Sequence, residues 1–154
     1  MLSCSASVSA KFPESASAII ITGASRGLGY ETALQLGMQG IPLVLAVRNP
    51  QYSTVVELCE RLATAGNTQV HVLTLDLSSV SSIRLFAQKL QAMSLRCSVL
   101  INNAGVIDIG ALENLSDDSI EHTFKTNVLA PILLTKAFLP LLSAARPSRI
   151  VNIG

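Results

Sequence analysis

Three glycines near the start of the chain stand between an apolar run and a segment with helical periodicity. Residues 18–22 (AIIIT) predict a buried strand, and residues 28–38 predict a helix that ends at Gly40. The glycines lie in the intervening segment, residues 22–29 (TGASRGLG). A glycine-rich turn between a strand and a helix brings backbone N–H groups and the positive end of the helix dipole close to a phosphate group. We therefore interpret this segment as a phosphate-binding turn, with an ordinary tight turn as the alternative.

The rest of the chain alternates short apolar runs with longer amphipathic segments. The predicted strands are residues 18–22, 43–47, 69–75, 98–101 and 148–153. The predicted helices are residues 28–38, 54–65, 80–93 and 119–142, with a short turn near Leu112. Such alternation is typical of an α/β protein in which helices cover both faces of a parallel sheet. The sequence therefore predicts a doubly wound parallel sheet.

The longest predicted helix, residues 119–142, has apolar residues at helical spacing. The side chains predicted to be buried are Ile120, Phe124, Val128, Pro131 or Ile132, Thr135, Leu139 and Leu142. Pro131 has no backbone N–H group, so the helix is expected to bend there.

Composition limits the classes of partner. The chain of 154 residues is 49% hydrophobic and 14% charged, which permits a packed core and excludes a disordered chain. The formal net charge is +1 and no basic run is present, so nucleic acid is not predicted as a partner. Three cysteines imply no disulfide framework and fit a reducing compartment. No metal site is predicted.

The N-terminal segment and the hydropathy pattern bear on localisation. Residues 1–17 are rich in Ser and Ala, and they lack the basic start and apolar core of a secretory signal. We interpret them as a disordered leader, with organelle import as the alternative. The longest uncharged stretch, residues 32–47, is interrupted by Gly37, Gly40 and Pro42, so no membrane span is predicted. A cytoplasmic location is expected.

Five motifs in the expected order resemble the short-chain dehydrogenase/reductase family. They are the glycine turn (residues 22–29), Asp76-Leu77, Asn102-Asn103-Ala104-Gly105, Asn127 within TNV, and residues 149–154 (RIVNIG). The resemblance covers residues 18–154 and implies a Rossmann-like domain with strand order 3-2-1-4-5, incomplete at its C-terminal side. It further implies a nicotinamide dinucleotide cofactor and hydride transfer between that cofactor and a carbonyl or alcohol. The cofactor-binding residues that it implies are Thr22, Gly23, Ser25, Arg26, Gly27, Leu28, Gly29, Arg48, Asn49, Asp76, Leu77, Asn103, Ala104 and Gly105.

The end of the second predicted strand bears on the choice of cofactor. A carboxylate at this place would bind the free ribose hydroxyls of NAD. This chain instead has Arg48 and Asn49, and no acid follows until Glu57. A guanidinium favours the 2′-phosphate of NADP, and Arg26 in the glycine turn could approach the same group. NADP is therefore the predicted cofactor; the alternative is that both arginines are solvated surface groups.

The residues that carry proton transfer in the family are not matched. Tyr30 and Tyr52 are the only tyrosines, and no lysine stands four residues after either of them. Of the family's catalytic tetrad only Asn127 has a counterpart, and a structural amide that braces the helix explains it as well as a catalytic one. No substitute acid is predicted. His122 is expected to lie away from the strand ends, and Cys97 is expected to be a small core residue.

The leading interpretation is an NADP-binding portion of a short-chain dehydrogenase/reductase that does not turn over alone, with a small carbonyl or alcohol as substrate only when it is completed. Residues 48–50 (RNP) and the helix over residues 123–142 resemble the retinol-dehydrogenase-like branch. A non-catalytic nucleotide-binding module and one half of a split enzyme are the alternatives. The fifth strand would be an exposed apolar edge, which predicts self-association.

Overall fold

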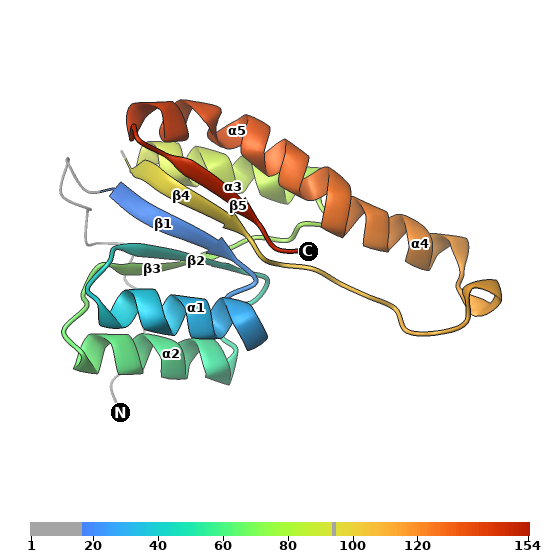
Figure 1. Cartoon of the computed structure of the whole chain (residues 1–154), viewed down its shortest axis with the longest axis horizontal. Coiled ribbons are helices and arrows are strands. Elements are labelled where there is room, and N and C mark those ends of the chain that lie inside the picture. Colours follow the sequence, from blue (N-terminus) through green and yellow to red (C-terminus); the bar gives the residue numbers. More distant parts are fainter. Residues whose placement is uncertain (1–16, 94) are drawn as a thin grey trace.

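The computed structural model describes residues 17–93 and 95–154 of the chain, and its centre is a parallel five-stranded sheet (Figure 1). The strand order is β3-β2-β1-β4-β5, which confirms the predicted order. The strands are β1 (Ser17–Thr22), β2 (Leu43–Val47), β3 (Val70–Thr74), β4 (Arg96–Asn102) and β5 (Arg149–Asn152). The predicted leader lies outside the described residues except for Ser17, which begins β1.

Helices cover both faces of the sheet. The helices are α1 (Gly27–Met38), α2 (Ser53–Thr64), α3 (Val80–Ala92), α4 (Asp117–Phe124) and α5 (Ala130–Ala144), with a short 3-10 turn η1 (Leu112–Asn114) and a π-helical turn η2 (Lys125–Leu129). Helices α1 and α2 lie on one face, and α3 and α5 lie on the other (Figure 1). This arrangement confirms the doubly wound α/β fold.

The core consists of two apolar clusters, one on each face of the sheet. Strand β2 shows how they arise, because all five of its side chains are buried. Leu43, Leu45 and Val47 pack on the α1–α2 side, whereas Val44 and Ala46 pack on the α3–α5 side. Side chains alternate between faces along a strand, so a strand covered on both faces reads as a continuous apolar run.

The last helix differs from its prediction. The chain forms one long helix, Asp117–Ala144, but its middle turn is the wider π-helical η2. The predicted stripe is wrong for most of its members, since Phe124, Ile132 and Leu139 are 60%, 59% and 52% exposed. The buried residues are Thr126, Ala130, Leu134, Phe138, Leu141 and Leu142. This helix is apolar on both sides, so spacing alone could not select the face that packs on the sheet.

The π-helical turn η2 stands just before Pro131, and the bend expected there stays a prediction. Pro131 lies inside the continuous helix Asp117–Ala144, just after η2, and it has no N–H group to donate to the preceding turn. By length and composition alone the helix Asp117–Ala144 is long and apolar enough to cross a membrane. Core helices of soluble proteins pass the same test, and α5 packs against β4 and α3. The expected absence of a membrane span stays a prediction.

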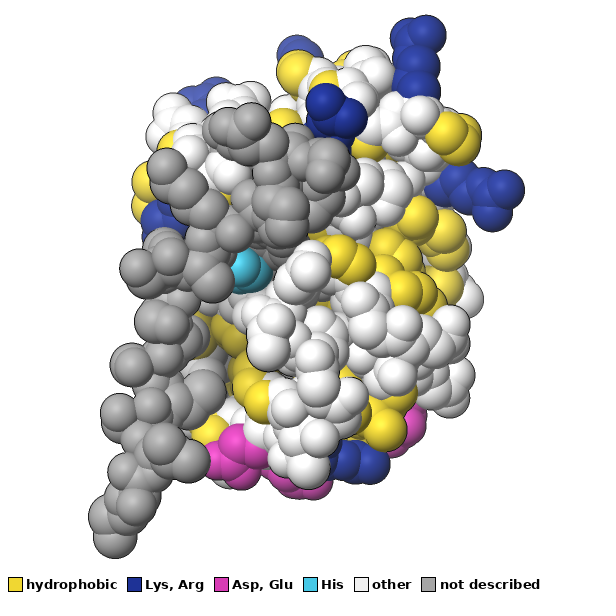
Figure 2. All heavy atoms as spheres, turned by 90° about the vertical axis from the view of Figure 1, so that its left-hand side faces the viewer, with side chains coloured by type: hydrophobic (Ala, Val, Ile, Leu, Met, Phe, Trp, Pro, Cys, Tyr) yellow, Lys and Arg dark blue, Asp and Glu magenta, His cyan; other side chains and the backbone are white. Residues whose placement is uncertain are grey.

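Two surfaces of the molecule bear on partners. All four residues of β5 are exposed at the edge of the sheet, as predicted. Figure 2 shows the molecule from the amino-terminal ends of the strands. Among the described residues of that face, the Lys and Arg side chains stand apart from one another and form no continuous basic patch.

Candidate functional site

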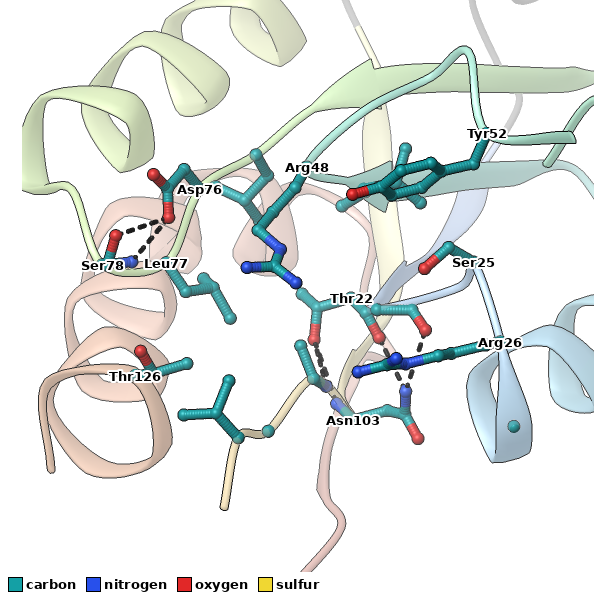
Figure 3. A pocket seen from close by; sticks show the side chains of 18 of the residues that line it. Thr22, Ser25, Arg26, Arg48, Tyr52, Asp76, Leu77, Ser78, Asn103 and Thr126 are labelled. Atoms are coloured by element: carbon teal, nitrogen blue, oxygen red, sulfur yellow. Dashed lines mark hydrogen bonds between the residues drawn. The ribbon is translucent and has the colours of Figure 1, made fainter. Parts of the chain in front are cut away.

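A cavity of about 390 Å³ opens at the carboxyl ends of β1 to β4 (Figure 3). The chain crosses over at this place, because β2 and β4 lie on opposite sides of β1. Open α/β sheets bind their ligands at such a point. The lining residues are Thr22, Gly23, Ser25, Arg26, Gly27, Leu28, Ala46, Val47, Arg48, Tyr52, Leu75, Asp76, Leu77, Ser78, Asn103, Ala104, Gly105, Val106, His122 and Thr126.

The glycine turn forms one wall of this cavity. Gly23 has a φ of +69°, in the left-handed region that glycine adopts without strain. Gly29 lies so close to the turn that a Cβ atom added to it would be 2.5 Å from the Gly23 carbonyl oxygen. Only glycine allows this approach, which places the start of α1 directly at the end of β1.

Thr22 connects the glycine turn with the loop after β4. Its buried hydroxyl accepts hydrogen bonds from the backbone N–H groups of Asn103 and Ala104, both at 3.0 Å. In return the Asn103 side-chain amide donates to the Thr22 carbonyl oxygen at 2.8 Å (Figure 3). These bonds fix the two loops that form the centre of the cavity.

Asp76 and Leu77 form the far side of the cavity, after β3. The Asp76 carboxylate accepts hydrogen bonds from the Ser78 backbone N–H group at 3.0 Å and from the Ser78 hydroxyl at 2.7 Å. It is therefore held within its own turn, and Figure 3 shows it at the edge of the cavity. Leu77 is buried and adds an apolar surface beside it.

Two guanidinium groups enter the cavity from different loops. Arg26 precedes α1 and Arg48 follows β2, and both side chains point toward the centre of the cavity in Figure 3. Neither guanidinium makes a hydrogen bond or ion pair among the described residues. Asp76 is the only carboxylate among the lining residues, and it already accepts two hydrogen bonds from Ser78. The centre of the cavity is therefore rich in cationic donors and suits an anion.

Two predicted cofactor-binding residues lie outside the cavity lining. Gly29 acts through the packing of the turn described above. The Asn49 side chain accepts a hydrogen bond from the Gln51 backbone N–H group at 2.9 Å, which forms an Asx turn after β2. Asn49 therefore shapes the loop that carries Arg48.

Asn127 occupies the π-helical turn and braces the loop after β4. Its Oδ1 atom accepts a hydrogen bond from the Val106 N–H group at 2.9 Å, and its Nδ2 atom donates to the Val106 carbonyl oxygen at 2.7 Å. Both ends of the amide thus bind one backbone residue, as the bracing interpretation requires. Asn127 lines a second groove of about 680 Å³, between α5 and the ends of β4 and β5, together with Val128 and Ile132.

Eight lining residues are not among the predicted ones: Ala46, Val47, Tyr52, Leu75, Ser78, Val106, His122 and Thr126. The expectation that His122 lies away from the strand ends is wrong, because α4 runs past the mouth of the cavity. The Thr126 hydroxyl is buried and has no hydrogen-bond partner in the part of the chain that the structure describes. His122 and Thr126 stand four residues apart on one helix, so the sequence predicts that they share a helix face. The sequence does not indicate that this face lies against the cavity.

The remaining titratable candidate, Cys97, is a core residue. Cys97 is buried, and burial raises the pKa of its thiol to about 12, so it is not a nucleophile near neutral pH. Within residues 17–93 and 95–154, no group of three or more His, Cys, Asp or Glu side chains could hold a metal ion.

The strand order, the crossover point and the glycine turn define a Rossmann-type α/β protein. Residues 17–154 match the sequence model of the short chain dehydrogenase family, and the chain belongs to this family. The resemblance predicted from the five motifs is thereby confirmed.

Individual relatives match most of this chain but a smaller part of their own length. Human retinol dehydrogenase 13 is 39% identical over 141 residues, which cover 88% of this chain and 40% of that protein. The Arabidopsis thaliana dehydrogenase/reductase SDR family member FEY is 35% identical over 138 residues, which cover 88% of this chain and 37% of that protein. The crystal structure of a metagenomic short-chain oxidoreductase in complex with NADP matches with a TM-score of 0.82 and 33% sequence identity. The match covers 92% of this chain and 64% of that one. The chain thus spans about two fifths of the length of these curated relatives.

Proposed function

We propose that the chain binds NADP and is the cofactor-binding part of an oxidoreductase of the short-chain dehydrogenase type. The observation that carries the proposal is the pair of unpaired guanidinium groups, Arg26 and Arg48, in a cavity without a carboxylate after β2. The structural relative crystallised with NADP supports the choice of cofactor. When bound, the dinucleotide supplies hydride transfer to or from a carbonyl or alcohol carbon.

Each part of the cavity fits one part of the dinucleotide. Backbone N–H groups of the glycine turn at the start of α1 hold the pyrophosphate. Arg48 and the Asp76–Leu77 side of the cavity would hold the adenosine, and Arg48 and Arg26 would hold its 2′-phosphate. A hydrogen bond to a charged group contributes about 1.5–3 kcal/mol, so a single such bond favours NADP over NAD about tenfold or more.

The substrate belongs to the neighbouring groove. This groove opens beside Gly105 and Asn127, and its apolar residues include Val128, Ile132 and Ile153. An apolar carbonyl or alcohol fits such a lining, in keeping with the retinol dehydrogenase among the relatives. No lysine follows Tyr30 or Tyr52 at the fourth position, so we expect the 154-residue chain to bind cofactor without turning over substrate.

The proposal is tested by titrating the chain with NADPH and with NADH. The wild-type chain is expected to bind NADPH at least about tenfold more tightly. Arg48→Ala should remove about tenfold or more of the affinity for NADPH and change that for NADH by less than about threefold, because only NADPH carries the 2′-phosphate. Arg84→Ala, an exposed arginine on α3 outside the cavity, is the matched control.

Three outcomes separate the alternatives. Equal losses of both dinucleotides in Arg48→Ala would remove the assignment of NADP. NADPH-dependent reduction of a small aldehyde by the chain alone would contradict the expected lack of turnover. Activity that appears only after a cell extract is added would favour one half of a split enzyme over a non-catalytic module.

A further inference from the structure

Tyr52 lines the cofactor cavity, and its hydroxyl has no hydrogen-bond partner among the described residues. The side chain is 42% exposed, so its ring is not part of either core cluster. The other tyrosine differs, because the Tyr30 hydroxyl donates to Glu57 at 3.5 Å and accepts from Arg61 at 3.1 Å. Packing and internal hydrogen bonds therefore account for Tyr30 but leave the Tyr52 hydroxyl without a role.

The backbone holds Tyr52 in a fixed place at the start of α2. Its carbonyl oxygen accepts hydrogen bonds from Val55 at 2.9 Å and from Val56 at 3.1 Å. The same turn is attached to the glycine turn, because the Thr54 hydroxyl donates to the Ser25 carbonyl oxygen at 2.7 Å. The backbone of Tyr52 is thus positioned before any ligand arrives, so binding has to order only its side chain.

The chemistry around Tyr52 is that of an anion site made of donors. Figure 3 shows the Tyr52 ring with its hydroxyl end toward Arg48, and the Ser25 and Arg26 side chains on the neighbouring wall. Guanidinium groups only donate hydrogen bonds, whereas a phosphate dianion only accepts them. A phenol beside two guanidiniums completes such a site with a neutral donor and adds no further positive charge.

We propose that Tyr52 is a specificity-determining residue that donates a hydrogen bond from its hydroxyl to the 2′-phosphate of the bound dinucleotide. This inference rests on the proposed function, since it assumes that Arg48 faces the same phosphate. It assigns part of the preference for NADP to the residue that directly precedes α2, in addition to Arg26 and Arg48.

The test compares Tyr52→Phe with Tyr30→Phe, which is the same change outside the cavity. Dissociation constants are measured for NADPH and NADH, and for adenosine 2′,5′-bisphosphate and adenosine 5′-monophosphate as probes of the phosphate alone. Tyr52→Phe is expected to weaken NADPH and the bisphosphate about tenfold, and to change NADH and the monophosphate by less than about twofold. Tyr30→Phe should leave all four constants within about twofold of wild type.

The outcomes distinguish the two proposals. A wild-type chain that prefers NADPH while Tyr52→Phe keeps the same NADPH-to-NADH ratio overturns this inference alone. Equal weakening of all four ligands also overturns it, because the hydroxyl would then act on the adenosine part that all four share. A wild-type chain that binds neither dinucleotide overturns the proposed function and this inference with it. Circular dichroism of Tyr52→Phe confirms that the exposed substitution leaves the fold intact.

Discussion

His71 is a buried titratable side chain on the edge strand β3, with only 8% of its surface exposed. Desolvation by burial disfavours the charged imidazolium and lowers the pKa of His71 from its ordinary value of 6.5. In the unfolded chain the same imidazole keeps its ordinary pKa. As the pH falls through about 6.5, the unfolded chain therefore takes up this proton before the folded protein does.

Because the pKa of His71 is lower in the folded protein than in the unfolded chain, we expect the protein to lose stability in mildly acidic solution. The contribution of His71 is fully present above about pH 6.5 and is lost as the pH falls from there toward the lowered pKa of the folded state. The free energy of unfolding in urea should be lower at about pH 5.5 than at about pH 7.5, and the difference should shrink in His71→Gln. The same difference in wild type and variant would show that His71 does not titrate in this way.

At the residue scale, the sequence predicts positions set by local chain geometry and misses those set by tertiary packing. Thr22 ends β1 and Arg48 directly follows β2, so their presence at the carboxyl edge of the sheet follows from the alternation alone. Tyr52 and His122 line the same cavity because of where the start of α2 and the last turn of α4 lie in space. Nothing in the spacing of a single sequence contains that information.

Among the elements, the π-helical turn η2 connects the last helix with the site. The Asn127 side chain in this turn makes both of its hydrogen bonds to Val106, which lines the cofactor cavity. Residues 103–106 form the same loop that Thr22 holds from the other side. The loop is thus fixed between β1 and the last helix, and its position depends on both.

Asn127→Ala should loosen this loop without unfolding the sheet. Two hydrogen bonds are lost, each contributing about 1 kcal/mol, so amide hydrogen exchange at Val106 should accelerate about tenfold or more. Affinity for NADPH should fall several-fold, because Ala104 and Gly105 line the cavity. Asn114→Ala, an exposed asparagine in η1, is the matched control and should change neither quantity. Unchanged exchange at Val106 in Asn127→Ala would contradict the bracing role.

The elements differ in how well the sequence predicted them. The strand and helix ranges agree closely, because short buried runs such as β2 alternate with segments of helical spacing. The buried face of α5 could not be predicted, since Leu134 and Phe138 on one side and Ile132 and Leu139 on the other fit the same period. Contact with β4 and α3 selects between them.

The whole molecule has one apolar side without a cover among the described residues. Phe124, Val128, Ile132 and Leu139 on the last helix are between 43% and 60% exposed, and Ile150 on the edge strand β5 is 40% exposed. Isolated exposed apolar residues are ordinary in soluble proteins, whereas a contiguous set along one helix is a surface that associates. The exposed edge of β5 adds unpaired backbone groups beside it.

We therefore expect the 154-residue chain to self-associate as its concentration rises, and Ile132→Glu to weaken the association. A buried Ile contributes about 1.5–3 kcal/mol through its apolar surface, and a carboxylate on the same spot adds the cost of burying a charge, so the association constant should fall at least about tenfold. Sedimentation velocity over a range of concentrations measures this change. Leu85→Glu is the matched control, because Leu85 is an exposed apolar residue of α3, 52% exposed. A chain that stays monomeric throughout, or an equal effect of both substitutions, would show that the helix face does not drive association.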